Sequence, residues 1–420
     1  LPNGEPRLWH PDLTPYEQPD LALPHGSRPD ERGLHAHKGQ SVLPLEGKHY
    51  AVQYQATRGR YRIKHPQRAN AYLPELNTNG LGAWTHEGER PQDWEGPTLM
   101  RRLGHDVDGF SEATLERARI ASGTDDDALR RMYIDSAPPP PLLADSLQRL
   151  KIDRQIDTAI GQIRAGQPLE SNTYWFESLV AYLDGWPEEK SLKVYENTDL
   201  SGRFRQYGNG QAGAEQTLAT SLAHVMSGQL AQSVVDFLSE AELQALLGPQ
   251  VAKGDRVQAL RNRLAEEASE FRTDIFNQLY QAGQTSENPG VRVLRQTVSE
   301  LPARTAETLL GDARGSELER LTKEQRLPLR VKNLAREAGF EARISHAYEG
   351  FYDDARWGPD TERLVLNTLR LHSDTFAELR IEVREGSFDG SLRCSVGAED
   401  ATIVRLLIRE ESDRYEVRDG

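Results

Sequence analysis

The spacing of three glycines is the pattern in this sequence with the most definite chemical meaning. Gly208, Gly210 and Gly213 form a G-x-G-x-x-G motif between a predicted strand and a predicted helix, which is the setting of a dinucleotide-binding loop. In such a loop, backbone N–H groups and a helix N-terminus contact a pyrophosphate. The alternative is a flexible exit from a hairpin into a helix. We favour this alternative and expect no cofactor, because the preceding strands have the pattern of a hairpin.

A second candidate site is the polar segment 343–354, which combines His346 and Glu349 with two tyrosines and two aspartates. The segment lies between a predicted helical domain and a predicted α+β module, where a cleft would suit acid/base chemistry. In that arrangement His346 is the general base and Glu349 orients it. The alternative is structural: the aromatic side chains pack the junction, and the carboxylates pair with Arg343 and Arg356.

Metal-binding and thiol chemistry have weaker support. His35 and His37 have the spacing of a two-histidine chelate on one strand, but the sequence offers no identifiable third ligand. Asp106 and Asp108 match only the start of a calcium-binding loop. We therefore predict no metal site. Cys394 is the only cysteine, so an internal disulfide is excluded.

Composition excludes two classes of partner. The chain has 51 Lys and Arg residues against 65 Asp and Glu residues, a net charge of −14. Such an acidic chain lacks the basic surface that binds nucleic acid or anionic membranes. No run approaches the ~20 apolar residues of a membrane-spanning helix. We predict a soluble protein with no nucleic-acid partner and no transmembrane segment.

The beginning of the chain also carries an expectation. It starts Leu1-Pro2-Asn3, without an initiator methionine. This suggests a piece cut from a longer polypeptide, whose other domains would be its first partners.

The length of 420 residues favours several domains. Residues 1–46 are rich in Pro, His and Asp and show no periodicity, so we expect an extended arm. Alternating residues from Tyr50 to Ile63 around a Gly turn predict a β-hairpin. Together with helices up to the amphipathic segment Leu142–Arg164, this hairpin makes a domain of residues 47–166.

One internal repeat is visible, in residues 167–213 and again in 341–420. Each copy reads as a helix followed by a hairpin whose second strand ends in glycine, Gly208 or Gly397. Residues 214–340 between the copies read as almost continuous helix, beginning with 217–227. The predicted fold class is α+β and predominantly helical, with two related helix-plus-β-hairpin modules flanking a helical domain.

Several motifs point to a family. They are Ala83-Trp84-Thr85-His86-Glu87, Trp94-Glu95-Gly96, Leu99–His105, Pro139–Asp145, Trp186-Pro187, Ala347-Tyr348-Glu349-Gly350 and Leu379–Arg384. Together they resemble the middle region of very large bacterial proteins that carry a dermonecrotic-toxin-like domain, and the resemblance covers most of the chain. Many members of that family continue into leucine-rich repeats and a novel E3 ubiquitin-ligase domain, and they look like secreted effectors or toxins.

The resemblance implies no catalytic residue for this stretch. The ligase's Cys-x-Asp motif is missing, because Ser395 and Val396 follow Cys394. We therefore predict a non-catalytic scaffold or interaction region of a large secreted bacterial toxin or effector, delivered to a host cell. Its partners would be other domains of the parent polypeptide, or a host or cognate protein. The alternatives are an autonomous enzyme toxin with its site at 343–354, and a host-protein binding module.

Overall fold

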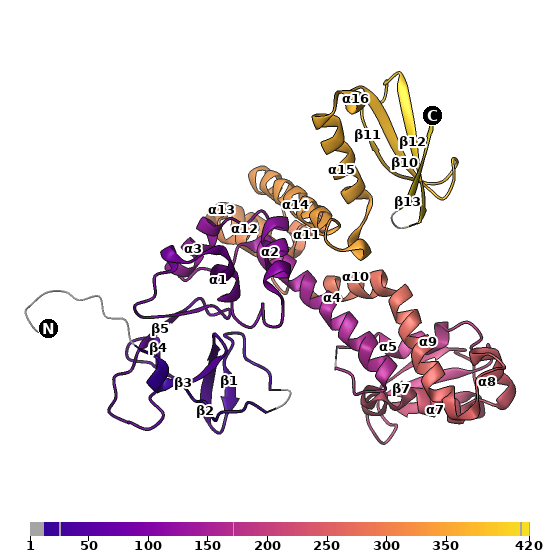
Figure 1. Ribbon diagram of the computed structural model, residues 1–420, viewed down its shortest axis with the longest axis horizontal. Coiled ribbons are helices and arrows are strands. Elements are labelled where there is room, and N and C mark those ends of the chain that lie inside the picture. The colour runs from indigo at the N-terminus through magenta and orange to yellow at the C-terminus, as the bar shows by residue number, and fades with distance from the viewer. Residues whose placement is uncertain (1–11, 25–26, 171, 412–413, 420) are drawn as a thin grey trace, which may run out of the picture. The chain divides into compact units, whose positions relative to one another are not determined.

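The computed structural model describes residues 12–24, 27–170, 172–411 and 414–419. It confirms a mixed α+β fold (Figure 1). The chain divides into two compact units. Unit 1 comprises Leu1–Gln148 and Thr285–Gly420, and unit 2 comprises Arg149–Gln284.

A six-stranded antiparallel sheet opens unit 1, with its strands in sequence order. The strands are β1 (His35–His37), β2 (Gln40–Leu45), β3 (Lys48–Gln55), β4 (Arg60–Ile63), β5 (Glu75–Thr78) and β6 (Trp84–His86). The predicted hairpin is confirmed as β3 and β4, where Tyr54 pairs with Tyr61. Leu43, Val52 and Trp84 belong to the core on one face of this sheet.

The prediction of an extended arm fails for residues 35–45, which form β1 and β2. The pattern was invisible in the sequence because Val42 and Leu43 are neighbours and both are buried, so the strand shows no alternation. The arm also includes the short 3-10 helix η1 (Thr14–Tyr16), whose Tyr16 hydroxyl donates to the carbonyl of Tyr72 at 2.8 Å. Residues 1–11 and 25–26 of the predicted arm lie outside the described residues.

Helices follow the sheet. They are η2 (Pro91–Asp93), α1 (Gly96–Arg101), α2 (Glu112–Ala121), α3 (Asp126–Asp135) and α4 (Pro141–Ala165). Two of these helices begin with side-chain caps: Ser111 accepts from the N–H of Thr114, and Asp125 accepts from that of Ala128. The long helix predicted at Leu142–Arg164 is confirmed as α4.

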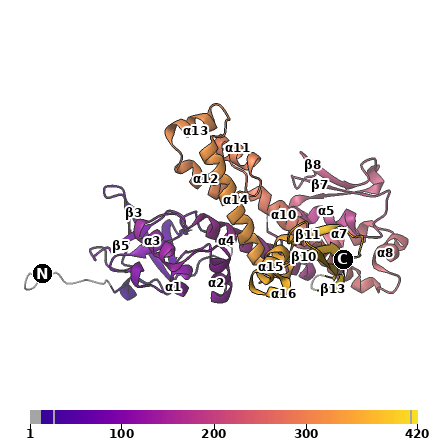
Figure 2. The ribbon, with the colours of Figure 1, turned by 90° about the horizontal axis from the view of Figure 1, so that it is seen from above.

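The second part of unit 1 contains α11 (Pro289–Thr297), α12 (Ala303–Gly311), α13 (Gly315–Thr322), α14 (Leu329–Glu349), η6 (Asp354–Arg356), α15 (Pro359–His372) and α16 (Asp374–Ala377). Helices α11, α12 and α13 lie against α14 (Figure 2). Gly339 makes this close packing possible, because a Cβ there would lie 2.5 Å from Cγ1 of Val298. The unit ends with β10 (Leu379–Glu385), β11 (Leu392–Val396), β12 (Ile403–Glu411) and β13 (Arg414–Asp419).

Unit 2 has its own core, which the second half of α4 shares. Its other elements are α5 (Phe176–Tyr182), β7 (Ser191–Tyr195), β8 (Phe204–Gly208), η3 (Ala214–Gln216), β9 (Thr217–Ser221), α6 (Leu222–His224), η4 (Val225–Gln229), α7 (Leu230–Phe237), α8 (Glu240–Leu247), η5 (Lys253–Asp255), α9 (Arg256–Glu270) and α10 (Arg272–Gly283). The helices predicted for 214–340 therefore pack into two separate cores, one in each unit.

The helix predicted at 217–227 is wrong at its beginning. Residues Thr217–Ser221 form β9, which pairs with β7 in parallel. Leu218 contacts the core and Thr220 is buried, and the β-branched residues Thr217 and Thr220 fit a strand better than a helix. The helical periodicity of the following residues extended the prediction too far back.

The two predicted repeat copies share one topology. In both, the central strand pairs antiparallel with the second strand of the hairpin and parallel with a later strand, giving the orders β8-β7-β9 and β11-β10-β12. Gly208 and Gly397 end the corresponding strands with φ of +83° and +99°. Each lies against a backbone carbonyl at the start of the central strand, that of Lys190 or Leu379.

We expect Gly208→Ala and Gly397→Ala each to lower the free energy of unfolding by about 1–3 kcal/mol, because a side chain is strained at positive φ and collides with that carbonyl. Gly210→Ala is the matched control in the same loop, since a Cβ there meets nothing within 4 Å. Amide hydrogen exchange of β7 and β10 measures the effect. Equal protection in Gly208→Ala and Gly210→Ala would contradict the steric argument.

Candidate functional site

The imidazole of His346 meets a buried carboxylate from a distant part of the chain. His346 lies near the end of α14, and its Nε2 is 2.6 Å from Oδ2 of Asp145, in the first turns of α4. The Asp145 side chain is 3% exposed and that of His346 is 23% exposed. The structure therefore gives His346 a carboxylate partner, and that partner is 201 residues away.

Small side chains let α4 and α14 approach each other at this pair. Ser146 and Ser345 are both buried, and their hydroxyl oxygens lie 3.4 Å apart. Ala342, one turn before Ser345, is fully buried. Close approach brings the short Asp145 side chain within reach of the imidazole.

Sequence reasoning missed Asp145, although a signal for it exists. Asp145 lies between Leu143 and Leu147, which point into the core from the same helix. A carboxylate within a buried helical stripe must find a donor, because an unpaired buried charge is costly. The partner of His346 lies outside the segment 343–354, so the spacing within that segment could not identify it.

Glu349 lies one turn after His346 in α14, and its carbonyl accepts from the N–H groups of Tyr352 and Asp353 as the helix ends. The role of orienter proposed for its carboxylate is filled by Asp145 in this structure. His346 and Glu349 thus remain on one helix, as the sequence spacing requires, while the carboxylate buried against the imidazole comes from α4.

The structural alternative for 343–354 describes part of what is seen. Tyr348 packs against Phe351, with ring centroids 5.7 Å apart, and Phe351 meets the edge of Trp357 at 6.2 Å. Arg343, however, pairs with Asp360 of α15 through two hydrogen bonds of 2.6 and 2.8 Å. The Arg343 guanidinium lowers the pKa of Asp360.

The glycine motif follows the end of a strand, and no α-helix begins directly after it. Gly208 ends β8, and after Gly213 the chain forms the three-residue η3 and then β9. A Cβ added at Gly210 or at Gly213 would have no heavy atom beyond its own residue and chain neighbours within 4 Å, so neither position needs glycine for close packing. Within residues 208–221, all of which are described, the helix N-terminus that a pyrophosphate would contact is therefore missing.

The remaining sequence candidates take structural positions. His35 accepts or donates a 2.8 Å hydrogen bond with the Ser27 hydroxyl, and burial is the main cause that lowers its pKa. Among the described residues, no group of three or more His, Cys, Asp or Glu side chains has the geometry to hold a metal ion. Burial raises the pKa of the Cys394 thiol to about 11, which leaves little thiolate at neutral pH.

Comparison of the chain with protein-family models, with curated proteins and with solved structures gave no match. None of the helices in the described ranges combines the length and apolar character needed to cross a bilayer.

We expect Asp145→Ala to lower the free energy of unfolding by about 1–3 kcal/mol, since it removes a buried charged partner from the imidazole. The control is Glu341→Gln, on an exposed turn of α14, with a change within about 0.5 kcal/mol. Urea unfolding of both variants, of His346→Ala and of the double variant measures the coupling. Additive losses in Asp145→Ala/His346→Ala would show that the pair contributes no interaction energy.

Proposed function

We propose that this chain is a non-catalytic scaffold and interaction region of a large secreted bacterial toxin or effector. The observation that carries the proposal is the duplicated module, in which a buried helix carboxylate is used to fasten the helix to its sheet. The bacterial, secreted context comes from the sequence resemblance. Other domains of the parent polypeptide, or a host or cognate protein, are the partners that such a region would hold.

The first module fastens α5 to β8. Glu177 is fully buried, and its carboxylate accepts from Nη2 and Nε of Arg205 at 2.5 and 3.0 Å. The hydroxyl of Tyr207, two residues along the same strand, donates to it at 3.1 Å. Three donors from one strand thus satisfy both oxygens of one helix residue.

The second module repeats the arrangement with other strand residues. Glu362 of α15 is 3% exposed and accepts from Nε of Arg393 at 3.1 and 3.2 Å. The hydroxyl of Tyr415 donates to it at 2.8 Å and accepts from Nε1 of Trp357 at 2.7 Å. The same glutamate position is therefore served by an arginine and a tyrosine in both copies.

These contacts favour a structural use of the chain's buried acids. A general acid or base must exchange a proton with a bound substrate. The carboxylate oxygens of Glu177 and Glu362 instead accept hydrogen bonds from side chains of their own module. Asp145 is likewise buried against His346. Duplication of such a frame supports a region that presents surfaces, rather than one that assembles a single reaction centre.

The Glu177 contact predicts a pH dependence. Burial raises the pKa of Glu177, and Arg205 opposes this. Because the pKa is higher in the folded state, ionised Glu177 costs stability above that pKa, and the cost disappears below the unfolded value of about 4.3. Glu177→Gln never ionises, so its stability relative to the natural chain rises as the pH increases from about 4.3 to the raised pKa of Glu177, by about 1.4 kcal/mol for each unit of pKa difference, and is constant above it.

Amide hydrogen exchange of β7, corrected for the intrinsic exchange rate at each pH, measures this difference. Glu196→Gln, an exposed substitution in the same hairpin, controls for the change in net charge and is expected to show no such trend. A relative stability of Glu177→Gln that falls with rising pH would contradict the assignment.

The function itself is tested by expressing residues 1–420 in a eukaryotic cytosol, beside His346→Ala/Glu349→Ala and the control Glu341→Gln at matched soluble abundance. The proposal expects a folded, abundant protein that leaves growth unchanged in all three. Growth arrest that is lost only in His346→Ala/Glu349→Ala would establish the enzyme alternative at segment 343–354. Equal growth arrest in all three would instead favour the alternative of a host-protein binding module that is toxic without the rest of the parent polypeptide.

A further inference from the structure

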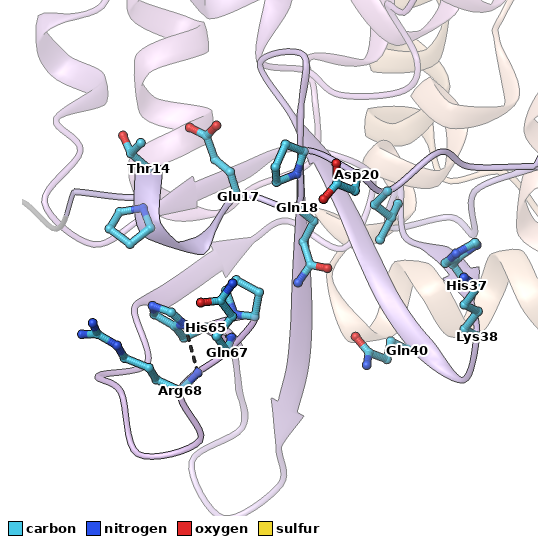
Figure 3. A pocket seen from close by; sticks show the side chains of 14 residues that line it. Thr14, Glu17, Gln18, Asp20, His37, Lys38, Gln40, His65, Gln67 and Arg68 are labelled. Carbon is cyan, nitrogen blue, oxygen red and sulfur yellow. Dashed lines mark hydrogen bonds between the residues drawn. The ribbon is translucent and has the colours of Figure 1, made fainter.

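Unit 1 also contains a polar groove whose lining includes neither Asp145 nor His346. Three segments surround it: residues 14–21 of the N-terminal arm, the β1–β2 turn at 37–40, and the loop at 65–68. Its volume is about 850 Å³, within the ~300–1,000 Å³ of typical small-molecule sites. Figure 3 shows Gln18 between Gln40 and the 65–68 loop.

The groove wall carries amide side chains that have no partner in the described part of the chain. Gln18, Gln40 and Gln67 come from the three different segments, and none of their carboxamides makes a hydrogen bond to another described residue. Each carboxamide offers two donors and one acceptor oxygen. Groups that the fold leaves uncommitted in a concave surface are free to bind a polar ligand.

His65 adds a donor with a fixed role. Its Nδ1 accepts from the backbone N–H groups of both Gln67 and Arg68, at 3.1 Å each. A nitrogen that accepts carries no proton, so the ring's proton is assigned to Nε2. Tyr16 packs an edge against the ring, with centroids 5.3 Å apart, which holds its orientation.

The charges in the groove nearly balance. Glu17 is paired with Lys48. Within the described ranges, the carboxylate of Asp20 and the cationic groups of Lys38 and Arg68 make no side-chain hydrogen bond or ion pair. The groove therefore has one carboxylate and two cationic groups without a partner among the described residues, a charge balance that favours neither a polyanion nor a metal cation as ligand. The chemistry suits a neutral ligand rich in groups that both donate and accept.

We propose that this groove binds a neutral oligosaccharide. Sugar hydroxyls both donate and accept, which matches carboxamides and a neutral imidazole. The rings of Pro15, Pro19 and Pro66 supply apolar surface beside these polar groups, which the C–H groups of a sugar can contact. A peptide partner is less suited, because its affinity rests on large apolar anchors in desolvated pockets, and Leu21 is the groove's one large aliphatic side chain. This inference does not rest on the proposed function.

The test uses the whole chain and three defined probes: maltotriose, mannotriose and chitotriose at about 10 mM, enough to saturate a site with a Kd of about 1 mM. Saturation-transfer NMR detects binding, and calorimetry gives the Kd. Gln18→Ala/Gln40→Ala removes amides that support no other contact, so it should fold normally. Gln211→Ala/Gln250→Ala, exposed in unit 2, is the matched control.

We expect at least one trisaccharide to bind, with a Kd that rises about tenfold in Gln18→Ala/Gln40→Ala and stays unchanged in the control. Absence of transfer to all three probes overturns the proposal. So does binding that is equal in both double variants. Binding of an oligoglutamate peptide, lost in Lys38→Gln/Arg68→Gln while no sugar binds, would assign the groove to an acidic partner instead.

Discussion

The burial of carboxylates under helices is the constraint on which much of this structure depends. A carboxylate removed from water is tolerated only when hydrogen-bond donors replace the solvent. Glu177 and Glu362 each occupy the first turn of a helix that covers a sheet. Each accepts hydrogen bonds from an arginine and a tyrosine on the strands of its module, and these contacts connect the helix to its sheet.

The same constraint joins segments that are far apart in sequence. Asp145 in the buried stripe of α4 needs a donor, and His346 of α14 provides it. Closing a loop of this sequence separation costs chain entropy, so local helix propensity alone cannot create the contact. The small buried side chains of Ser146, Ser345 and Ala342 lie beside the pair, where the two helices meet.

Local patterns in the sequence were sufficient for elements that local physics determines. The β3–β4 hairpin follows from alternation around Gly59, and α4 follows from its apolar stripe. The repeat was visible because each copy reads as a helix followed by a hairpin whose second strand ends in glycine, and both glycines have positive φ. The α+β class follows from the presence of both periodicities in one chain.

What failed in prediction depends on contacts that no local window contains. β9 is a strand because β7 lies beside it in parallel, and a parallel partner leaves no hairpin signal in the sequence. β2 is buried on both faces, so alternation is lost. Asp145 was overlooked for the same reason, since its partner His346 lies 201 residues later in the chain, in the second segment of unit 1.

The polar side chains of this protein fall into two groups with different physical roles. Glu177, Glu362 and Asp145 are buried and bonded within the fold, because leaving any of them unpaired would cost more than a kilocalorie or two in a protein that is only marginally stable. Gln18 and Gln40 remain in contact with water, so the fold gains nothing from their amide groups and loses nothing when a ligand binds them. Polar groups that do not stabilise the fold are therefore the better guide to recognition, and Gln18, Gln40 and Gln67 line one groove of unit 1.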